Sequence, residues 1–170
     1  MCSRLSYGEN DNMMDKAKKI LIWIPAVILA VMIFGFSGQN GEQSVGLSHK
    51  VAEILVDGAD ALHLIDIKYI GREHAIEQMQ VPVRKIAHMT EYALFALSVY
   101  IALAVDEVKW RWTKYAAFLI VVAYACTDEL HQLFISGRNG SIVDVLIDAT
   151  GGFIAIFICM MCDKRRKVVI

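Results

Sequence analysis

The chain has 170 residues, 56% of them hydrophobic, and a formal net charge of −1. This length favours a single domain. The apolar share exceeds that of a typical soluble domain, and the near-neutral charge gives no reason to expect a nucleic-acid partner. The position of the charges is more informative than their number, because the apolar residues are concentrated in four segments.

The N-terminal residues 1–19 are polar and lack periodicity, which predicts a cytoplasmic tail without regular structure. The first apolar segment follows at residues 20–36 and carries no charge. Its length is close to what an α-helix needs to cross about 30 Å of hydrocarbon. It lacks a clear signal-peptide cleavage site, so we expect an uncleaved membrane anchor.

The next segment, residues 37–84, is too long for a simple loop and is predicted to contain helices of its own. In its first half, apolar residues recur at helical spacing while acidic residues take other positions, which is typical of an amphipathic helix. The apolar residues are Leu47, Val51, Ile54, Leu55, Ala59 and Leu62. A second helix is expected over residues 67–79, and Pro82 suits the first turn of the next membrane helix.

Three further apolar segments follow at residues 86–105, 115–135 and 142–162, each long enough to cross a bilayer. A soluble chain of this size could not easily bury four such helices on all sides. The predicted fold class is therefore all-α: a polytopic membrane protein with four transmembrane helices. The segment between the first and second helices is expected to be an external amphipathic one that lies on the bilayer surface or covers the bundle.

The distribution of basic residues predicts the orientation of the chain. Eleven of the 17 Lys and Arg residues lie before the first span, between the second and third, or after the fourth. Cytoplasmic segments of membrane proteins are enriched in Lys and Arg. Both termini, including the basic tail at residues 163–170, are therefore expected on the cytoplasmic side of the plasma membrane. The segment 37–84 and the loop around Arg138 are expected outside.

Polar side chains from several predicted spans fall at one depth, near the outer end of each span. His88 and Glu91 lie one and two turns inside the second span, and Asp144 and Asp148 share a face of the fourth. A charge facing lipid costs about 2.5–3.5 kcal/mol on insertion scales, so these groups are expected to face the bundle interior. The candidate polar site comprises Ser37, Gln39, Arg84, Lys85, His88, Glu91, Tyr92, Asp128, Glu129, His131, Gln132, Arg138, Asp144 and Asp148. The alternative is a set of structural salt bridges between helices.

Three stretches of the sequence resemble the signature blocks of the VanZ-like membrane proteins. They are FSGQ at residues 36–39, RKIAHMTEYALF at 84–95 and TDELHQLFISGRNGSIVDVLIDATGG at 127–152. The resemblance covers a domain of about residues 20–162. It departs at Gly38, where the family often has serine, and at Asp148, where asparagine is common.

This resemblance implies a small bacterial polytopic membrane protein. The family is named for a member linked to resistance to the glycopeptide antibiotic teicoplanin. No established catalytic mechanism comes with the family, so the resemblance assigns no catalytic role to any residue.

Two main hypotheses for function follow. In the first, the outer-leaflet site binds or acts on a membrane lipid, a lipid-linked wall precursor or a lipoglycopeptide, and contributes to glycopeptide resistance. In the second, the protein is a membrane-embedded hydrolase or transferase. Its acids, bases or metal ligands would come from His88, His131, Asp128, Glu129 and Asp144. A coupled transporter is disfavoured because the inner halves of the spans carry few polar residues. The sequence identifies no cofactor, metal or substrate.

Overall fold

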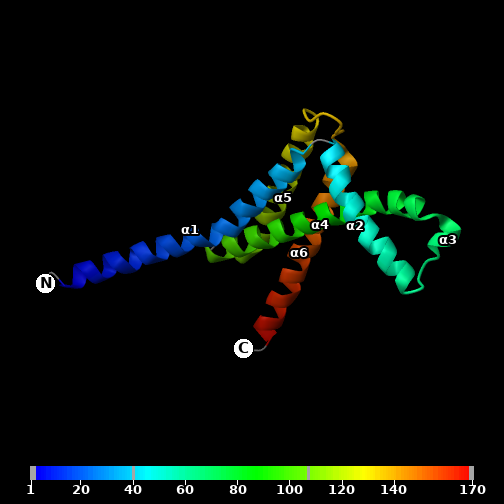
Figure 1. Cartoon of the computed structure of the whole chain (residues 1–170). Helices are drawn as coiled ribbons and strands as arrows, with labels where there is room; N and C mark the ends of the chain where they lie inside the picture. Colours follow the sequence, from blue (N-terminus) through cyan, green and yellow to red (C-terminus); the bar gives the residue numbers. More distant parts are fainter. Residues whose placement is uncertain (1–2, 40, 107, 169–170) are drawn as a thin grey trace.

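The computed structural model describes residues 3–39, 41–106 and 108–168, which form six α-helices and no strand. The helices are α1 (Ser3–Ser37), α2 (Gly41–Ala61), α3 (Ile67–Ile70), α4 (Arg72–Val105), α5 (Trp110–Gln132) and α6 (Ile142–Val168) (Figure 1). The all-α prediction is confirmed for this part of the chain.

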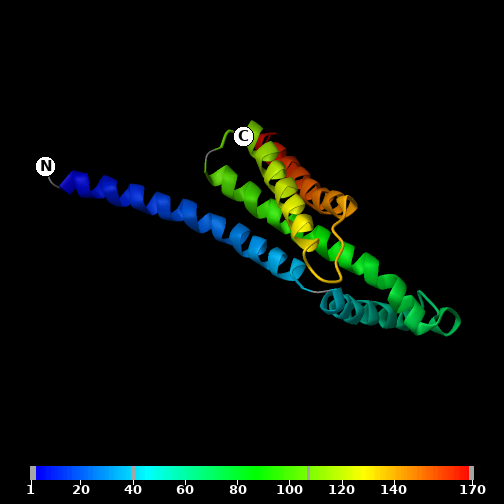
Figure 2. The same ribbon diagram turned by 90° about the horizontal axis from the view of Figure 1, so that it is seen from above.

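Helix α4 is the centre of the structure, because it contacts each of the other five helices. At 1.5 Å per residue its 34 residues extend over about 50 Å, more than the thickness of a bilayer's hydrocarbon. One part of α4 packs with α1, α5 and α6, and the part near its N-terminus extends toward α2 and α3 (Figures 1 and 2). The helix therefore joins the bundle to the segment that precedes it.

An apolar core holds α1, α4, α5 and α6 together. Its most completely buried members include Ile33, Tyr92, Val99 and Val121. The outward faces of the same helices carry many exposed large apolar side chains. Exposed apolar surface on this scale suits contact with lipid better than contact with water.

Glycines allow α6 to lie unusually close to its neighbours. A Cβ atom added at Gly151 would overlap the carbonyl oxygen of Met89 on α4. A Cβ atom added at Gly152 would lie 2.7 Å from a methyl carbon of Val121 on α5. Small residues at such positions let membrane helices approach at the level of their backbones.

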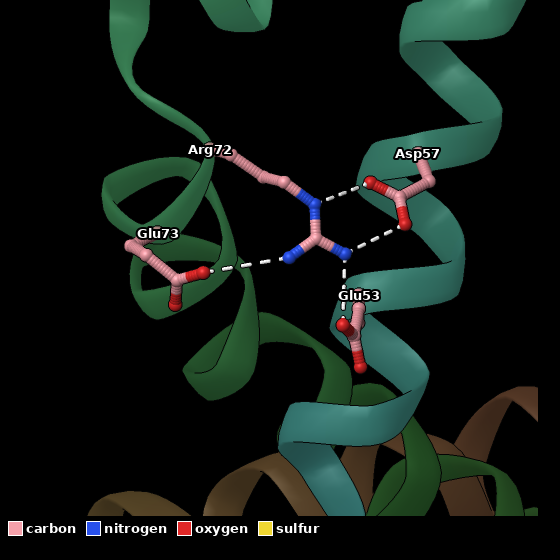
Figure 3. A network of polar contacts seen from close by, with 4 residues as sticks. All are labelled: Glu53, Asp57, Arg72 and Glu73. Atoms are coloured by element: carbon pink, nitrogen blue, oxygen red, sulfur yellow. Dashed lines mark hydrogen bonds and ion pairs between the residues drawn. The ribbon is translucent and has the colours of Figure 1, made fainter.

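One guanidinium ties the start of α4 to α2 (Figure 3). Arg72 donates from Nε and Nη2 to the two carboxylate oxygens of Asp57, at 2.9 and 2.7 Å, and from Nη2 to Glu53 at 2.8 Å. The same guanidinium holds the pKa of the Asp57 carboxyl below its usual range, so this acid stays ionised to lower pH. The two helices also share a small buried apolar cluster, made of Ala52, Val56, Ala75 and Ile76.

Three segments of the described chain are long and apolar enough to cross a membrane: Lys16–Ser37, Arg72–Val105 and Ile142–Cys162. They contain the whole of the spans predicted at 20–36, 86–105 and 142–162. The span predicted at 115–135 falls mainly on α5, which is not one of these three segments and carries charged residues in both its first and its last turns.

Two predicted boundaries are wrong. The tail was expected to lack regular structure, but α1 begins at Ser3, because extending a helix costs little once an apolar segment has nucleated it. The helix expected over residues 67–79 is divided at Gly71, whose φ of 88° ends α3 before α4 starts. Pro82 consequently lies inside α4 rather than in a first turn.

The apolar stripe predicted for the external helix falls on α2, but most of it is exposed. Ile54 and Leu62 are each 72% exposed. The side chains that α2 buries against α4 are instead the smaller Ala52 and Val56. The predicted helix exists, but the large apolar residues of its predicted stripe stay largely exposed in the described chain.

Replacing Gly151 with alanine should destabilise the bundle, because the added methyl group would push α6 away from Met89. Overpacking of this kind costs about 1–3 kcal/mol. The measurement is the thermal unfolding midpoint of the purified protein in detergent, which should fall. Gly35→Ala is the control, since a Cβ atom there meets nothing within 4 Å. Equal midpoints for the two variants would contradict the close approach of α4 and α6.

Candidate functional site

Polar residues from α4, α5, α6 and the loop between α5 and α6 surround one pocket of about 180 Å³. It is lined by Arg84, Lys85, His88, Glu129, Gln132, Gly137, Arg138, Asn139, Asp144, Ile147 and Asp148. Eight of these eleven residues belong to the polar site predicted from the sequence. The structure therefore brings together residues that lie up to 64 positions apart in the chain, from Arg84 to Asp148.

Helical spacing explains why these side chains meet. Lys85 and His88 lie one turn apart on α4, and Asp144 and Asp148 lie one turn apart at the start of α6. The loop from α5 to α6 then turns back over them. Gly137 in this loop has a φ of 75°, a left-handed conformation that glycine adopts at little cost.

An ion pair joins α4 to α6 at the pocket. Lys85 Nζ donates to Asp144 Oδ1 at 2.5 Å, with side chains that are 36% and 35% exposed. Polar contacts between membrane helices contribute only about 0.6 kcal/mol on average. The pair therefore contributes little to stability, and its main effect is to neutralise the charge of Asp144 in the pocket.

Arg138 connects the loop to the end of α1. Its Nη1 donates to Gln132 Oε1 at 3.4 Å, and its Nη2 donates to the carbonyl oxygen of Phe36 at 3.3 Å. Burial lowers the pKa of this guanidinium, and repulsion from Arg84 lowers it further, although arginine still carries its charge. Its Nε is buried without a hydrogen-bond partner among the described residues. The side chain thus retains donor capacity for an anion.

Three buried carboxylates lie together beside the pocket. Asp128, Glu129 and Asp148 are 2%, 7% and 2% exposed, and one oxygen from each lies within 4.8 Å of the other two. Glu129 accepts a hydrogen bond from the backbone N–H of Ser141 at 2.7 Å, and Asp128 accepts one from Gln132 at 3.4 Å. Within the described part of the chain, no Lys or Arg forms an ion pair with this acidic triad.

Two fully buried hydroxyl groups adjoin the acidic triad. Ser37 on α1 and Tyr92 on α4 are each 0% exposed and lie beside the Asp128 carboxyl. Neither hydroxyl has a hydrogen-bond partner among the described residues, and the same holds for Asp128 Oδ1. Buried polar atoms in folded proteins are almost always hydrogen-bonded. The three atoms adjoin one another, so a small rotation would pair each hydroxyl with Asp128, and a bound ion or water molecule would satisfy them as well.

An apolar groove of about 370 Å³ lies next to the polar pocket. It is formed by the end of α1, one face of α2 and the middle of α4, and its lining includes Leu47, Val51 and Leu55. The groove and the polar pocket have Arg84, His88 and Arg138 in common. These three residues form a shared wall between an apolar and a polar space.

A family model described as VanZ/LLP1 matches residues 22–163. The chain belongs to the VanZ/LLP1 family. The matched region contains every residue of the predicted polar site, and the resemblance seen in the sequence is confirmed. Together with the three apolar helices, membership identifies a multi-pass membrane protein. No curated protein and no solved structure matches the chain.

The remaining predicted site residues of this VanZ/LLP1 protein lie around the pocket rather than in it. Gln39 and Glu91 line the apolar groove, and Glu91 Oε2 lies 3.5 Å from Nδ1 of His88. His131 stacks on Phe34 with ring centroids 4.2 Å apart. His131 therefore packs against α1, whereas His88 lies where both cavities meet.

Sequence reasoning missed Gly137, Asn139 and Ile147 among the pocket residues. The first two stand in the turn-forming stretch SGRNGS, which marks a tight loop but does not show what the loop covers. The apolar groove was also missed. Its signal is the apolar stripe on residues 47–62, which by itself predicts only a surface that covers the bundle or rests on the bilayer.

Proposed function

We propose that this VanZ/LLP1 protein binds an amphiphilic molecule of the cell envelope at the outer leaflet of the plasma membrane. Its anionic head group would occupy the polar pocket and its chain the apolar groove. The candidates are a membrane lipid, a lipid-linked wall precursor and a lipoglycopeptide. The observation that carries the proposal is the wall of Arg84, His88 and Arg138 shared by the two cavities.

The chemistry of the shared wall suits a phosphate or carboxylate group. Guanidinium groups bind such anions through paired hydrogen bonds, and arginine stays charged when it is partly buried. Arg138 lies between the two cavities with an unpaired, buried Nε. The groove is lined mainly by aliphatic side chains of α2 and α4, which favour an acyl or isoprenoid chain.

The direction of the helices supports four membrane spans. Lys85 pairs with Asp144, and further along both helices Met89 contacts Gly151, so α4 and α6 run in the same general direction (Figure 2). If both cross the membrane in one direction, the chain must return between them. Only α5 lies between them in the sequence, and its 23 residues extend over about 34 Å, enough to cross.

The start of α5 resembles a membrane–water boundary. Trp112 and Tyr115 are 55% and 59% exposed, with Arg111 and Lys114 over their rings at 5.4 and 5.0 Å. Aromatic belts with flanking basic residues mark such boundaries, and basic residues favour the cytoplasmic side. We therefore place this end and both termini in the cytoplasm, and the polar pocket, α2 and α3 at the outer face.

A role in resistance would follow from binding. A protein that holds a wall precursor or a lipoglycopeptide at the outer leaflet changes how much of it is free to interact with its usual partner. Teicoplanin resistance is therefore part of the proposal, through the family to which the chain belongs.

The second candidate is a membrane-embedded hydrolase or transferase acting on the same class of molecule. The observation that favours it is the acidic triad beside His88, because closely placed carboxylates and a histidine are the groups that general acid–base catalysis uses. Turnover of a lipid-linked substrate by the purified protein would distinguish this candidate from binding alone.

Cysteine labelling tests the four-span topology. In a background in which Cys2, Cys126, Cys159 and Cys162 are replaced by serine, Asn139→Cys should react with an impermeant maleimide in intact cells. Lys109→Cys, at the opposite end of α5, should react only after the membrane is permeabilised. Labelling of both positions from the outside would overturn the topology.

Native mass spectrometry in a neutral detergent tests lipid binding. The wild type should retain phosphatidylglycerol in preference to phosphatidylcholine, and Arg84→Gln or Arg138→Gln should weaken retention roughly tenfold, because a hydrogen bond to a charged group contributes about 1.5–3 kcal/mol. Arg111→Gln, at the cytoplasmic end, is the control and should behave as wild type. Equal retention of the two lipids by the wild type would contradict an anionic head-group site.

Antibiotic susceptibility tests the proposed role in resistance. Expression of the wild type in a susceptible Gram-positive host should raise the teicoplanin concentration needed to stop growth. Lys85→Ala, Glu129→Gln and Arg138→Ala should lose this protection at equal membrane levels, and Arg111→Ala should keep it. If none of the proteins protects, resistance is not a property of this chain, and lipid retention remains the test of binding.

A further inference from the structure

We propose that Asp128, Glu129 and Asp148 bind one divalent cation of the kind that prefers oxygen ligands: Mg²⁺, Mn²⁺ or Ca²⁺. The geometry of the triad fits such an ion. Its oxygens lie within 4.8 Å of one another. Ligands on opposite sides of an ion, each at 2.0–2.6 Å from it, are separated by about 4–5 Å. All three carboxylates can therefore reach one ion after small side-chain rotations.

Charge supplies the driving force. Three carboxylates this close repel one another, and the cost is larger where water is excluded. Two cationic side chains of the pocket already have other partners, since Lys85 pairs with Asp144 and Arg138 bonds Gln132 and the end of α1. A divalent cation would neutralise two of the three charges at once.

The buried hydroxyl groups give independent support. Ser37 and Tyr92 come from two other helices, are fully buried and adjoin the Asp128 carboxyl, but their alignment with it is too poor for a hydrogen bond of good geometry. A hydroxyl oxygen can bind a hard cation directly, or hydrogen-bond to a water molecule that the cation holds. The cluster therefore offers ligands from α1, α4, α5 and α6 around one point.

The nature of the ligands selects the metal. The cluster offers oxygen atoms only, and carboxylates and hydroxyls suit Mg²⁺, Mn²⁺ and Ca²⁺ rather than zinc. His131 stacks on Phe34, and Asp144 is held by Lys85, so two of the ligands first considered from the sequence are engaged elsewhere.

The cation would be reachable from the polar pocket. Glu129 and Asp148 line that pocket, whereas Asp128 lies behind them. Mg²⁺ and Mn²⁺ commonly keep water molecules or bind phosphate oxygens on their open side. If the proposed lipid binding holds, the cation would face the head group, but the site itself does not depend on a lipid.

Titration with Mn²⁺ alone tests the site. The full-length protein, purified in a neutral detergent and freed of metal with a chelator, is titrated while the electron paramagnetic resonance signal of free Mn²⁺ is recorded. The wild type should bind one Mn²⁺ per chain, and added Mg²⁺ or Ca²⁺ should compete. Asp148→Asn should weaken binding roughly tenfold or more. Glu77→Gln, at an exposed acid of α4 that lines neither cavity, should bind as the wild type does.

Thermal unfolding separates loss of a ligand from loss of the fold. In chelator, Asp148→Asn should be at least as stable as the wild type, because it removes one of three repelling charges. Addition of Mn²⁺ should raise the midpoint of the wild type and leave that of Asp148→Asn unchanged. The proposal is overturned if the wild type shows no saturable binding, or if both proteins bind Mn²⁺ equally well. Neither readout involves lipid, so failure of lipid binding would leave this test intact.

Discussion

The arrangement of this protein depends on the close contact between α4 and α6. Because Gly151 has no side chain, its backbone meets the carbonyl of Met89, and this contact fixes the position of α6 along the axis of α4. In this position Asp144 lies beside Lys85. Asp148 lies one turn further along α6, and His88 lies one turn further along α4. Any larger residue at position 151 would separate the helices, and the polar groups of the pocket would separate with them.

Much of the site could be predicted because a helix converts sequence position into depth and direction. A rise of 1.5 Å per residue puts His88, Asp128 and Asp144 near one level, and the repeat of 3.6 residues puts Asp144 and Asp148 on one face. The cost of charges in lipid then indicates that they face inward. These rules concern each helix alone, so they do not specify which groups pair between helices.

What could not be predicted depends on contacts between elements. The pairing of Lys85 with Asp144 leaves Asp148 to the other acids, and the stacking of His131 on Phe34 removes a histidine from the pocket. The break at Gly71 depends on a backbone conformation that the surrounding apolar pattern hides. The groove beside the pocket depends on how α2 meets α4: Ala52 and Val56 are buried between the helices, and Leu47, Val51 and Leu55 line the groove.

The charge of the pocket links the two proposals. Around it lie three cationic side chains, Arg84, Lys85 and Arg138, and four carboxylates, Asp128, Glu129, Asp144 and Asp148. With all four acids ionised and His88 neutral, one negative charge is in excess, and the pocket alone then offers an anionic head group no net attraction. A divalent cation at the acidic triad reverses the sign and leaves an excess of one positive charge. The acids alone would repel an anion. When they hold a divalent cation, that cation attracts the anion, and the acids contribute to anion binding through it.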